Sequence, residues 1–221
     1  MPNDFLQRIA TVDTDTHPAG FAISPGVVTD NLDPLGTARV KVRVPELPAF
    51  EPWCRMVAVG GGAGRGFVWV PQINDEVLVA FNQDDERDAY VLGGLWAMRD
   101  RPPLTSPADF LIKRVIKTGM TSGAGHEVEF DDAQQSIKIT TTTKQKVTID
   151  PTQIELKNTA GTLTIKMDNA SQTISIQAGV KIELKATQIS LQGTQVEIKG
   201  TKVDLQAAGP CTIQGLPVKI N

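Results

Sequence analysis

The residues of this chain that could do chemistry are few and lie far apart. Two acidic runs, Asp84-Asp85-Glu86 and Asp131-Asp132, have the side chains to hold a hard cation or to act as paired carboxylates in hydrolysis. A cation site needs several converging oxygens, and a hydrolytic pair needs a cleft with one acid in an apolar setting. Both runs fall where a hairpin is expected to turn, which favours solvated turn carboxylates. We therefore expect no catalytic residue and no enzymatic activity.

The chain has few residues for metal or redox chemistry. His17 and His126 are the only histidines, and neither has a second ligand at metal spacing. Cys54 and Cys211 lie in different halves of the chain, and two small buried apolar residues without a disulfide are the simplest interpretation. We expect no metal ion and no cofactor.

A glycine-rich run at residues 60–66 has the composition of a phosphate-binding loop. Such a loop opens a helix, whereas this run is followed by the strand-like Phe67-Val-Trp-Val70 and by Pro71, so a plain barrel loop is expected. The formal net charge of −3 gives no basic surface for nucleic acid. Residues 1–10 lack the apolar run of a signal peptide, and no stretch approaches the ~20 apolar residues of a membrane span. We expect a chain made in the cytoplasm.

The strongest pattern is a pair of aliphatic residues separated by one polar residue, repeated through the last hundred positions. Residues two apart point to opposite sides of a helix but to the same side of a strand, so the pattern predicts short strands joined by turns. The spacing tightens to about seven residues after Val180. The pairs are Val128/Phe130, Ile137/Ile139, Val147/Ile149, Ile154/Leu156, Leu163/Ile165, Ile174/Ile176, Ile182/Leu184, Ile189/Leu191, Val196/Ile198, Val203/Leu205, Cys211/Ile213 and Val218/Ile220.

Composition divides the chain into two halves built on different rules. Ten of the eleven aromatic residues and eleven of the fourteen prolines lie at or before Phe110. The second half has about two inward side chains per strand, which is too thin for a core of its own. Strands this short favour several identical chains wrapped together over a solenoid made by one chain.

The first half has the alternation of a small closed β-domain between residues 26 and 96. A hairpin is expected around Asp33-Pro-Leu-Gly36, a strand from Trp53, a further strand at Phe67–Val70, one at Glu76–Phe81 and one at Tyr90–Leu92. Five or six strands in about 70 residues indicate a barrel such as the OB-fold.

Ordered motifs in this region resemble the OB domain of the central spike of contractile tails. They are Gly26-Val-Val-Thr-Asp-Asn-x-Asp-Pro-x-Gly36, Arg39-Val-x-Val-x-Val-Pro45, Trp53-x-Arg55, Ala63-Gly-Arg-Gly-Phe67, Pro71-x-x-x-Asp75-Glu-Val-Leu-Val-x-Phe81 and Val91-Leu-Gly-Gly-Leu-Trp96. The family includes phage baseplate assembly protein V, the VgrG proteins of type VI secretion and the spikes of extracellular injection systems. Gly125-His-Glu-Val-Glu-Phe-Asp-Asp132 and Cys211–Asn221 are also similar to VgrG β-prism sequences.

The resemblance implies an all-β homotrimer in which an OB-fold barrel is followed by an intertwined trimeric β-helix, or β-prism, needle. We expect an N-terminal hub-contacting segment at 1–24, the OB-fold at 25–98, a linker at 99–117 and the needle at 118–221 with its tip at 211–221. Residues 118–180 either wind or form antiparallel arms. The expected axial core is Ile182, Leu184, Ile189, Leu191, Val196, Ile198, Val203 and Leu205.

Partners follow from the same resemblance. A separate hub protein is expected at the barrel end, contacted by Phe5, Leu6 and Ile9. A PAAR-repeat tip protein is expected on an apolar platform at the other end, formed by Leu216, Pro217, Val218 and Ile220. Tape-measure protein or effector cargo and transient contact with a target membrane complete the expected partners. The whole would be a non-enzymatic spike in the baseplate of a phage virion or injection particle.

Other classes stay open at this point. A trimeric tail fibre or adhesin shares the β-helix but would carry a receptor-binding domain. A stand-alone OB module for single-stranded nucleic acid would need stacking aromatics in a basic groove. A polysaccharide-cleaving β-helix enzyme would need acid clusters on one face. The mass in solution separates these classes, because a monomer would exclude a trimeric spike.

Overall fold

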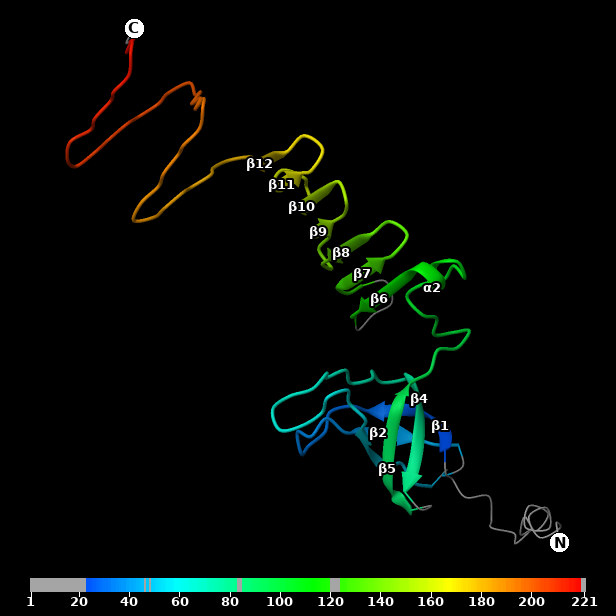
Figure 1. Ribbon diagram of the computed structural model, residues 1–221. Helices are drawn as coiled ribbons and strands as arrows, with labels where there is room; N and C mark the ends of the chain where they lie inside the picture. The colour runs from blue at the N-terminus through cyan, green and yellow to red at the C-terminus, as the bar shows by residue number, and fades with distance from the viewer. Residues whose placement is uncertain (1–22, 46, 48, 83–84, 120–123, 220–221) are drawn as a thin grey trace, which may run out of the picture. The chain divides into compact units, whose positions relative to one another are not determined.

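The computed structural model describes residues 23–45, 47, 49–82, 85–119 and 124–219. It divides into one unit that ends at Gly179 and a second from Val180 to the C-terminus, and we describe each by itself. The described part is all-β apart from one short helical turn (Figure 1). Within it no helix has the length and apolar character needed to cross a bilayer.

The first part of the chain forms a closed five-stranded barrel with the strand order β1-β2-β3-β5-β4. Its strands are β1 (Ile23–Asp30), β2 (Val40–Arg43), β3 (Trp53–Met56), β4 (Glu76–Asn82) and β5 (Asp85–Gly94). All neighbours are antiparallel except β3 and β5, which are parallel. The predicted OB-type barrel is therefore confirmed, with five strands. The sixth strand expected at Phe67–Val70 is wrong, because that segment has no strand partner.

Alternation along the strands builds the barrel core. Every second residue of β2 and β4 points inward, as in Val40 and Val42 or Val77 and Val79, and all four are fully buried. Cys54 belongs to this core, and burial raises the pKa of its thiol to about 12. The expectation of a buried, unbridged Cys54 is confirmed. Cys211 is exposed in the single chain, contrary to the expectation that both cysteines are buried.

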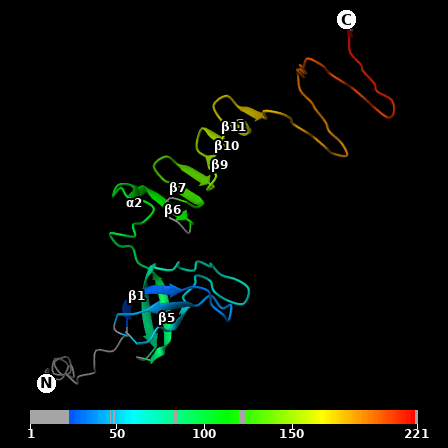
Figure 2. The same cartoon turned by 180° about the vertical axis from the view of Figure 1, so that it is seen from behind.

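Seven antiparallel strands follow the barrel and lie in chain order, so each pairs with the strand before it. They are β6 (Lys113–Lys117), β7 (Glu127–Asp131), β8 (Ser136–Thr140), β9 (Lys146–Ile149), β10 (Gln153–Lys157), β11 (Thr164–Asp168) and β12 (Thr173–Gln177). We call this sheet the meander. The same order of strands is visible from behind in Figure 2. The described residues of 113–119 and 124–177 thus form antiparallel arms.

The meander begins earlier than the sequence pattern indicated. Helix α2 (Asp109–Ile112) is one short turn, and β6 follows it directly, inside the range expected as a linker. Strand β6 reads Lys-Arg-Val-Ile-Lys, which carries only one residue of an aliphatic pair on each face. The periodic signal was therefore absent, although β6 pairs with all five residues of β7.

Turn chemistry separates the strands of the meander. Gln135, Lys144 and Gln172 adopt positive φ in three of the connections, which reverse the chain within a few residues. Asp168 accepts hydrogen bonds from the backbone N–H groups of Ala170 and Ser171 at 3.1 and 3.0 Å. The bond from Ser171 is the main cause that lowers the pKa of Asp168 to about 2.

Residues 180–219 form the second unit, which is extended and bent at intervals. No residue of this described segment belongs to a strand, because none has a ladder partner within the chain. Backbone N–H and C=O groups that lie in extended conformation without partners are available to other strands.

Candidate functional site

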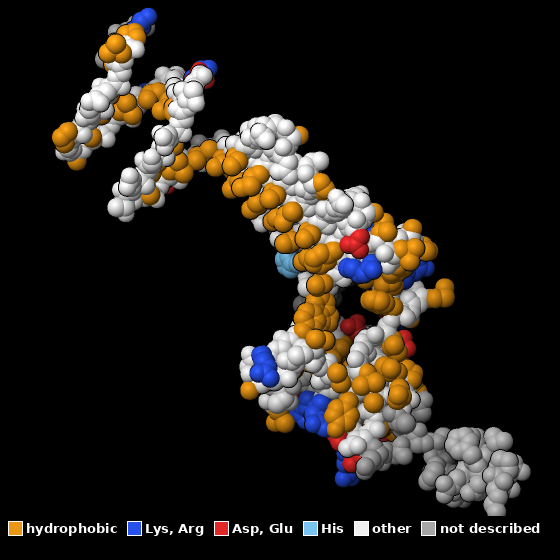
Figure 3. Space-filling model, viewed as in Figure 1, with side chains coloured by type: hydrophobic (Ala, Val, Ile, Leu, Met, Phe, Trp, Pro, Cys, Tyr) orange, Lys and Arg blue, Asp and Glu red, His pale blue; other side chains and the backbone are white. Residues whose placement is uncertain are grey.

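The register of the meander aligns its aliphatic pairs into two continuous rows on one face. The first row runs through Arg114, Phe130, Ile137, Ile149, Ile154, Met167 and Ile174. The second row runs through Ile116, Val128, Ile139, Val147, Leu156, Ile165 and Ile176. Only Arg114 interrupts the apolar surface, at the first strand. Figure 3 shows this surface as a band of hydrophobic side chains along the meander.

These two rows remain largely exposed among the described residues of the single chain. Ile137, Ile149 and Ile154 remain 37–41% exposed although each has strand neighbours on both sides. Ile174 on the terminal strand is 68% exposed. A continuous apolar face of this kind is rare on a monomer and marks an interaction surface.

The reverse face of the meander is polar and internally paired. Its central row runs through Val115, Glu129, Lys138, Thr148, Glu155, Lys166 and Ser175. Lys138 Nζ lies 3.3 Å from Glu129, and Lys117 Nζ lies 2.9 Å from Glu127. Exposed pairs of this type contribute about 0–1 kcal/mol each, so this face is suited to solvent.

The second unit has the same two faces without the ladder. Lys181 and Lys185 flank Glu183 at 3.2 and 3.0 Å on one side of an extended segment. Ile182 and Leu184 occupy the alternate positions, at 53% and 66% exposed. The pattern returns with the Lys199–Glu197 pair at 2.7 Å and the Lys202–Asp204 pair at 2.6 Å.

The predicted axial-core and tip residues lie along this unit. All eight axial residues, from Ile182 to Leu205, are exposed in the single chain. At the tip, Leu216 is fully exposed, Pro217 is exposed and Val218 is about half exposed. Ile220 and the predicted hub contacts Phe5, Leu6 and Ile9 lie outside the described residues. The described residues of the second unit therefore carry a series of exposed aliphatic side chains on a backbone without strand partners.

Most of the acidic residues and histidines considered first as candidates for chemistry either make structural hydrogen bonds or lie outside the described residues. Among the described residues no three His, Cys, Asp or Glu side chains gather as metal ligands. Asp131 is buried; it accepts a hydrogen bond from the Gln134 N–H at 2.9 Å and faces Lys113 Nζ at 3.8 Å. His126 donates its backbone N–H to Thr118 Oγ1 at 2.9 Å. His17 and Asp84 lie outside the described residues.

Two polar clusters on the barrel escaped the sequence reasoning. In the first, Asp33 Oδ1 accepts from Arg39 Nη2 at 2.8 Å, and the Arg39 guanidinium, with further donors from Thr37 and Leu35, holds the pKa of Asp33 well below its usual range. In the second, hydrogen bonds from Asn82 and Arg55 lower the pKa of Asp88. The sequence predicted Asp33 as a turn residue in Asp33-Pro-Leu-Gly36. It did not predict the hydrogen bond from Arg39, which lies six residues later.

Together these features define a described chain that is almost entirely β, with an OB-type barrel and an exposed apolar face on the meander. Comparison with known proteins supports the OB-type fold of the barrel. Residues 24–96 match the family model of the type VI secretion system and phage-baseplate injector OB domain. The match lies on the barrel strands, so the barrel is similar to an injector OB domain.

A relative among known proteins is the actin cross-linking toxin VgrG1 of Vibrio cholerae serotype O1 (strain ATCC 39541 / Classical Ogawa 395 / O395). It is 31% identical to this chain over 81 residues, which cover 36% of the chain. The chain spans only 7% of the length of that relative.

Proposed function

We propose that this chain is the non-enzymatic central spike of a contractile injection machine and acts as a homotrimer. The observation that carries the proposal is the exposed aliphatic series that continues from the meander through the unpaired second unit, attached to an injector OB domain. Three such faces turned toward one axis would bury their aliphatic rows together and leave the charged faces in solvent. The unpaired backbone of residues 180–219 would then pair with strands of the other two chains.

Interleaved strands explain why such a needle resists force. A chain whose ladder partners belong to both neighbours cannot leave without breaking hydrogen bonds along its whole length. The proposed task is mechanical: sheath contraction drives the spike through the target envelope, and no turnover is involved. A hub protein would hold the barrel through Phe5, Leu6 and Ile9, and a PAAR-repeat protein would sit on the platform of Leu216, Pro217, Val218 and Ile220. A phage virion or an injection particle would contain the assembly.

The mass of the full chain in solution tests the trimer. The expected value is about three times the 23.8 kDa of one chain. A monomer at micromolar concentration would exclude the proposed spike.

Hydrogen exchange tests the interleaving independently of the mass. Backbone amides of residues 182–205 have no strand partner in one chain, so they would exchange rapidly in any trimer that leaves them single. Protection of these amides, comparable to that of β9 and β10, is expected from inter-chain ladders. A trimer with rapid exchange there points instead to a fibre held together only by the meander.

A further inference from the structure

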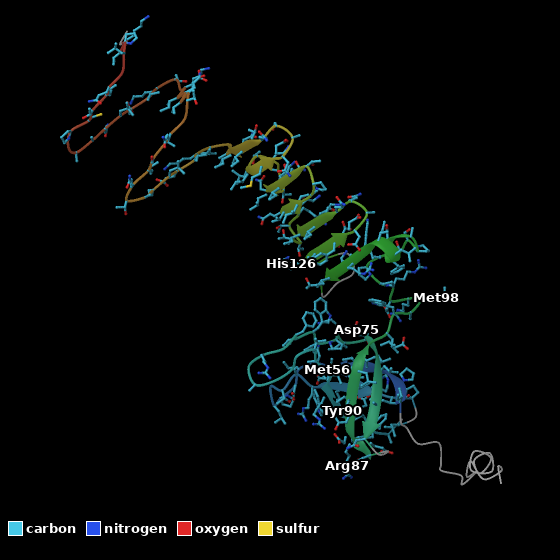
Figure 4. The ribbon with its side chains drawn as sticks, viewed as in Figure 1. Met56, Asp75, Arg87, Tyr90, Met98 and His126 are labelled. Carbon is cyan, nitrogen blue, oxygen red and sulfur yellow. The ribbon has the colours of Figure 1, made fainter. Side chains whose placement is uncertain are left out.

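Among the described residues, every buried hydrophobic side chain belongs to the barrel. These side chains lie between Val28 and Val91 and form one cluster. The five strands around them close on themselves, so the barrel leaves no open sheet edge. Figure 4 shows Met56 and Tyr90 on this part of the chain, on the adjacent strands β3 and β5. A closed sheet around its own apolar core has what a small domain needs to fold within one chain.

The meander has seven strands but no apolar core of this kind. Of the described residues in its strands, only Asp131 and Ser136 are buried, and both are polar. Leu156 and Ile165 lie on the inner strands β10 and β11, yet they are 44% and 45% exposed. In one chain the meander is therefore a single sheet layer whose apolar face meets water.

Hydrogen bonds alone do not hold such a layer. Fixing the backbone of each strand residue costs conformational entropy, and a backbone hydrogen bond that replaces one to water gives a small net gain. The burial of apolar surface offsets this cost. That burial is complete in the barrel core and partial in the meander. Surface ion pairs such as Lys117–Glu127 join neighbouring strands but add little.

We propose that the barrel folds in the single chain, whereas the meander becomes stable only when copies of the chain associate. The inference rests on the proposed trimer, in which the aliphatic rows of three chains contact one another. Ordering of β6 to β12 is then part of the association step, although every hydrogen bond of this ladder lies within one chain. The needle would form only where several chains meet, after the barrel of each chain is already folded.

Hydrogen exchange on a full chain that cannot associate tests this dependence. Ile149→Asp/Ile174→Asp places two carboxylates in the first aliphatic row, and the matched Thr148→Asp/Ser175→Asp places them one residue away on the reverse face. In the first variant, as a single chain, amides of β8 to β11 should exchange at least about a hundredfold faster than in the wild-type trimer. Amides of β1 and β4 should stay within about twofold of wild type in both variants. The second variant should keep the wild-type protection of the meander.

The concentration dependence of melting gives a second readout that needs no substitution. All three tryptophans, Trp53, Trp69 and Trp96, precede the meander. Tryptophan fluorescence therefore follows the barrel, while far-ultraviolet circular dichroism follows both parts. The meander transition should move to higher temperature as the protein concentration rises, because association stabilises it. The barrel transition should stay within about 2 °C over a hundredfold range of concentration.

The outcomes separate this inference from the proposed function. Protected meander amides in the single-chain variant, or a meander transition of the wild-type trimer that is independent of concentration, overturn the inference and leave the spike in place. Loss of barrel protection together with meander protection also overturns it, because the barrel would then not fold alone. A first variant that remains trimeric, or a wild-type chain that is monomeric, overturns the proposed spike instead.

Discussion

At the scale of single residues, Asp33 shows how one carboxylate fixes a loop of the barrel. Its oxygens accept hydrogen bonds from the backbone N–H groups of Leu35 and Thr37, from the Thr37 hydroxyl and from Arg39. Arg39 in turn lies 5.6 Å from the centre of the Trp53 ring. The residues that join β1 to β2 are therefore held by a charge-assisted network.

Asp33→Asn is expected to lower the thermal midpoint of barrel unfolding and to flatten its acid dependence. The pKa of Asp33 is lowered in the folded state by Arg39. Its contribution is therefore fully present above the unfolded aspartate pKa of about 4 and is lost as the pH falls through the folded value. Tryptophan fluorescence, which comes from Trp53, Trp69 and Trp96, measures both effects during melting at pH 7 and below pH 4. Asp30→Asn is the control, since Asp30 accepts from Leu32 N–H alone among the hydrogen bonds found.

Gly26→Ala is expected to destabilise the barrel by about 1–3 kcal/mol through overpacking. A Cβ at this position would lie 2.5 Å from Val42 Cγ1, and Val42 is fully buried and cannot yield. Gly93→Ala is the matched control, because nothing lies within 4 Å of its Cβ position. Denaturant unfolding of both variants, followed by tryptophan fluorescence, gives the comparison. Equal stability of the two would contradict the packing argument.

At the scale of elements, the meander is a sheet with one apolar face and one polar face. Ile149 lies in the first aliphatic row between Ile137 and Ile154, and Thr148 lies on the reverse face between Lys138 and Glu155. Adjacent residues of one strand thus belong to different environments in the proposed trimer. A substitution that hardly affects the single chain should affect the assembly at only one of the two positions.

Ile149→Asp is expected to prevent trimer formation or to lower the trimer melting temperature by about 10 °C or more. A buried unpaired carboxylate costs several kcal/mol, and the trimer would bury three. Thr148→Asp, one residue away on the polar face, should have little effect. Mass in solution and thermal melting compare the two. If both variants behave alike, the aliphatic rows do not form the interface.

At the scale of the whole molecule, the chain is organised along its length, with the barrel first, the paired meander next and the unpaired unit last. In the proposed spike, each part offers a different surface to a partner. Deletion of Gly215–Asn221 should abolish binding of a PAAR-repeat protein while the trimer remains, because the platform residues are removed and the preceding aliphatic pairs are kept. Pull-down with the tip protein and mass measurement check this. Unchanged tip binding would exclude the platform.

Much of the fold followed from local pattern. The alternation of Val77, Val79 and Phe81 predicted the inward face of β4. The paired aliphatic residues of β7 to β12 predicted one face of the meander. Strand β6 was missed because Arg114 occupies the place of an aliphatic partner. Asp33 was taken as a turn residue, since its bond to Arg39 spans six positions and depends on how the loop closes. Residues 57–70 were expected to form a plain loop and a strand. The exposure of their apolar side chains could not be predicted from composition.

By itself, the sequence determined the all-β class, the barrel region and the two-faced character of the second half, because side-chain alternation in a strand has a fixed period of two. Only the tertiary structure decided that the pairs align into two rows from β6 to β12, since register depends on each turn in succession. It also decided where pairing within the chain ends. Beyond Gly179 the extended segments carry the same pattern, but the described residues form no strand ladder there. A ladder of backbone hydrogen bonds requires two strands, and the pattern of one strand does not say which strand is its neighbour.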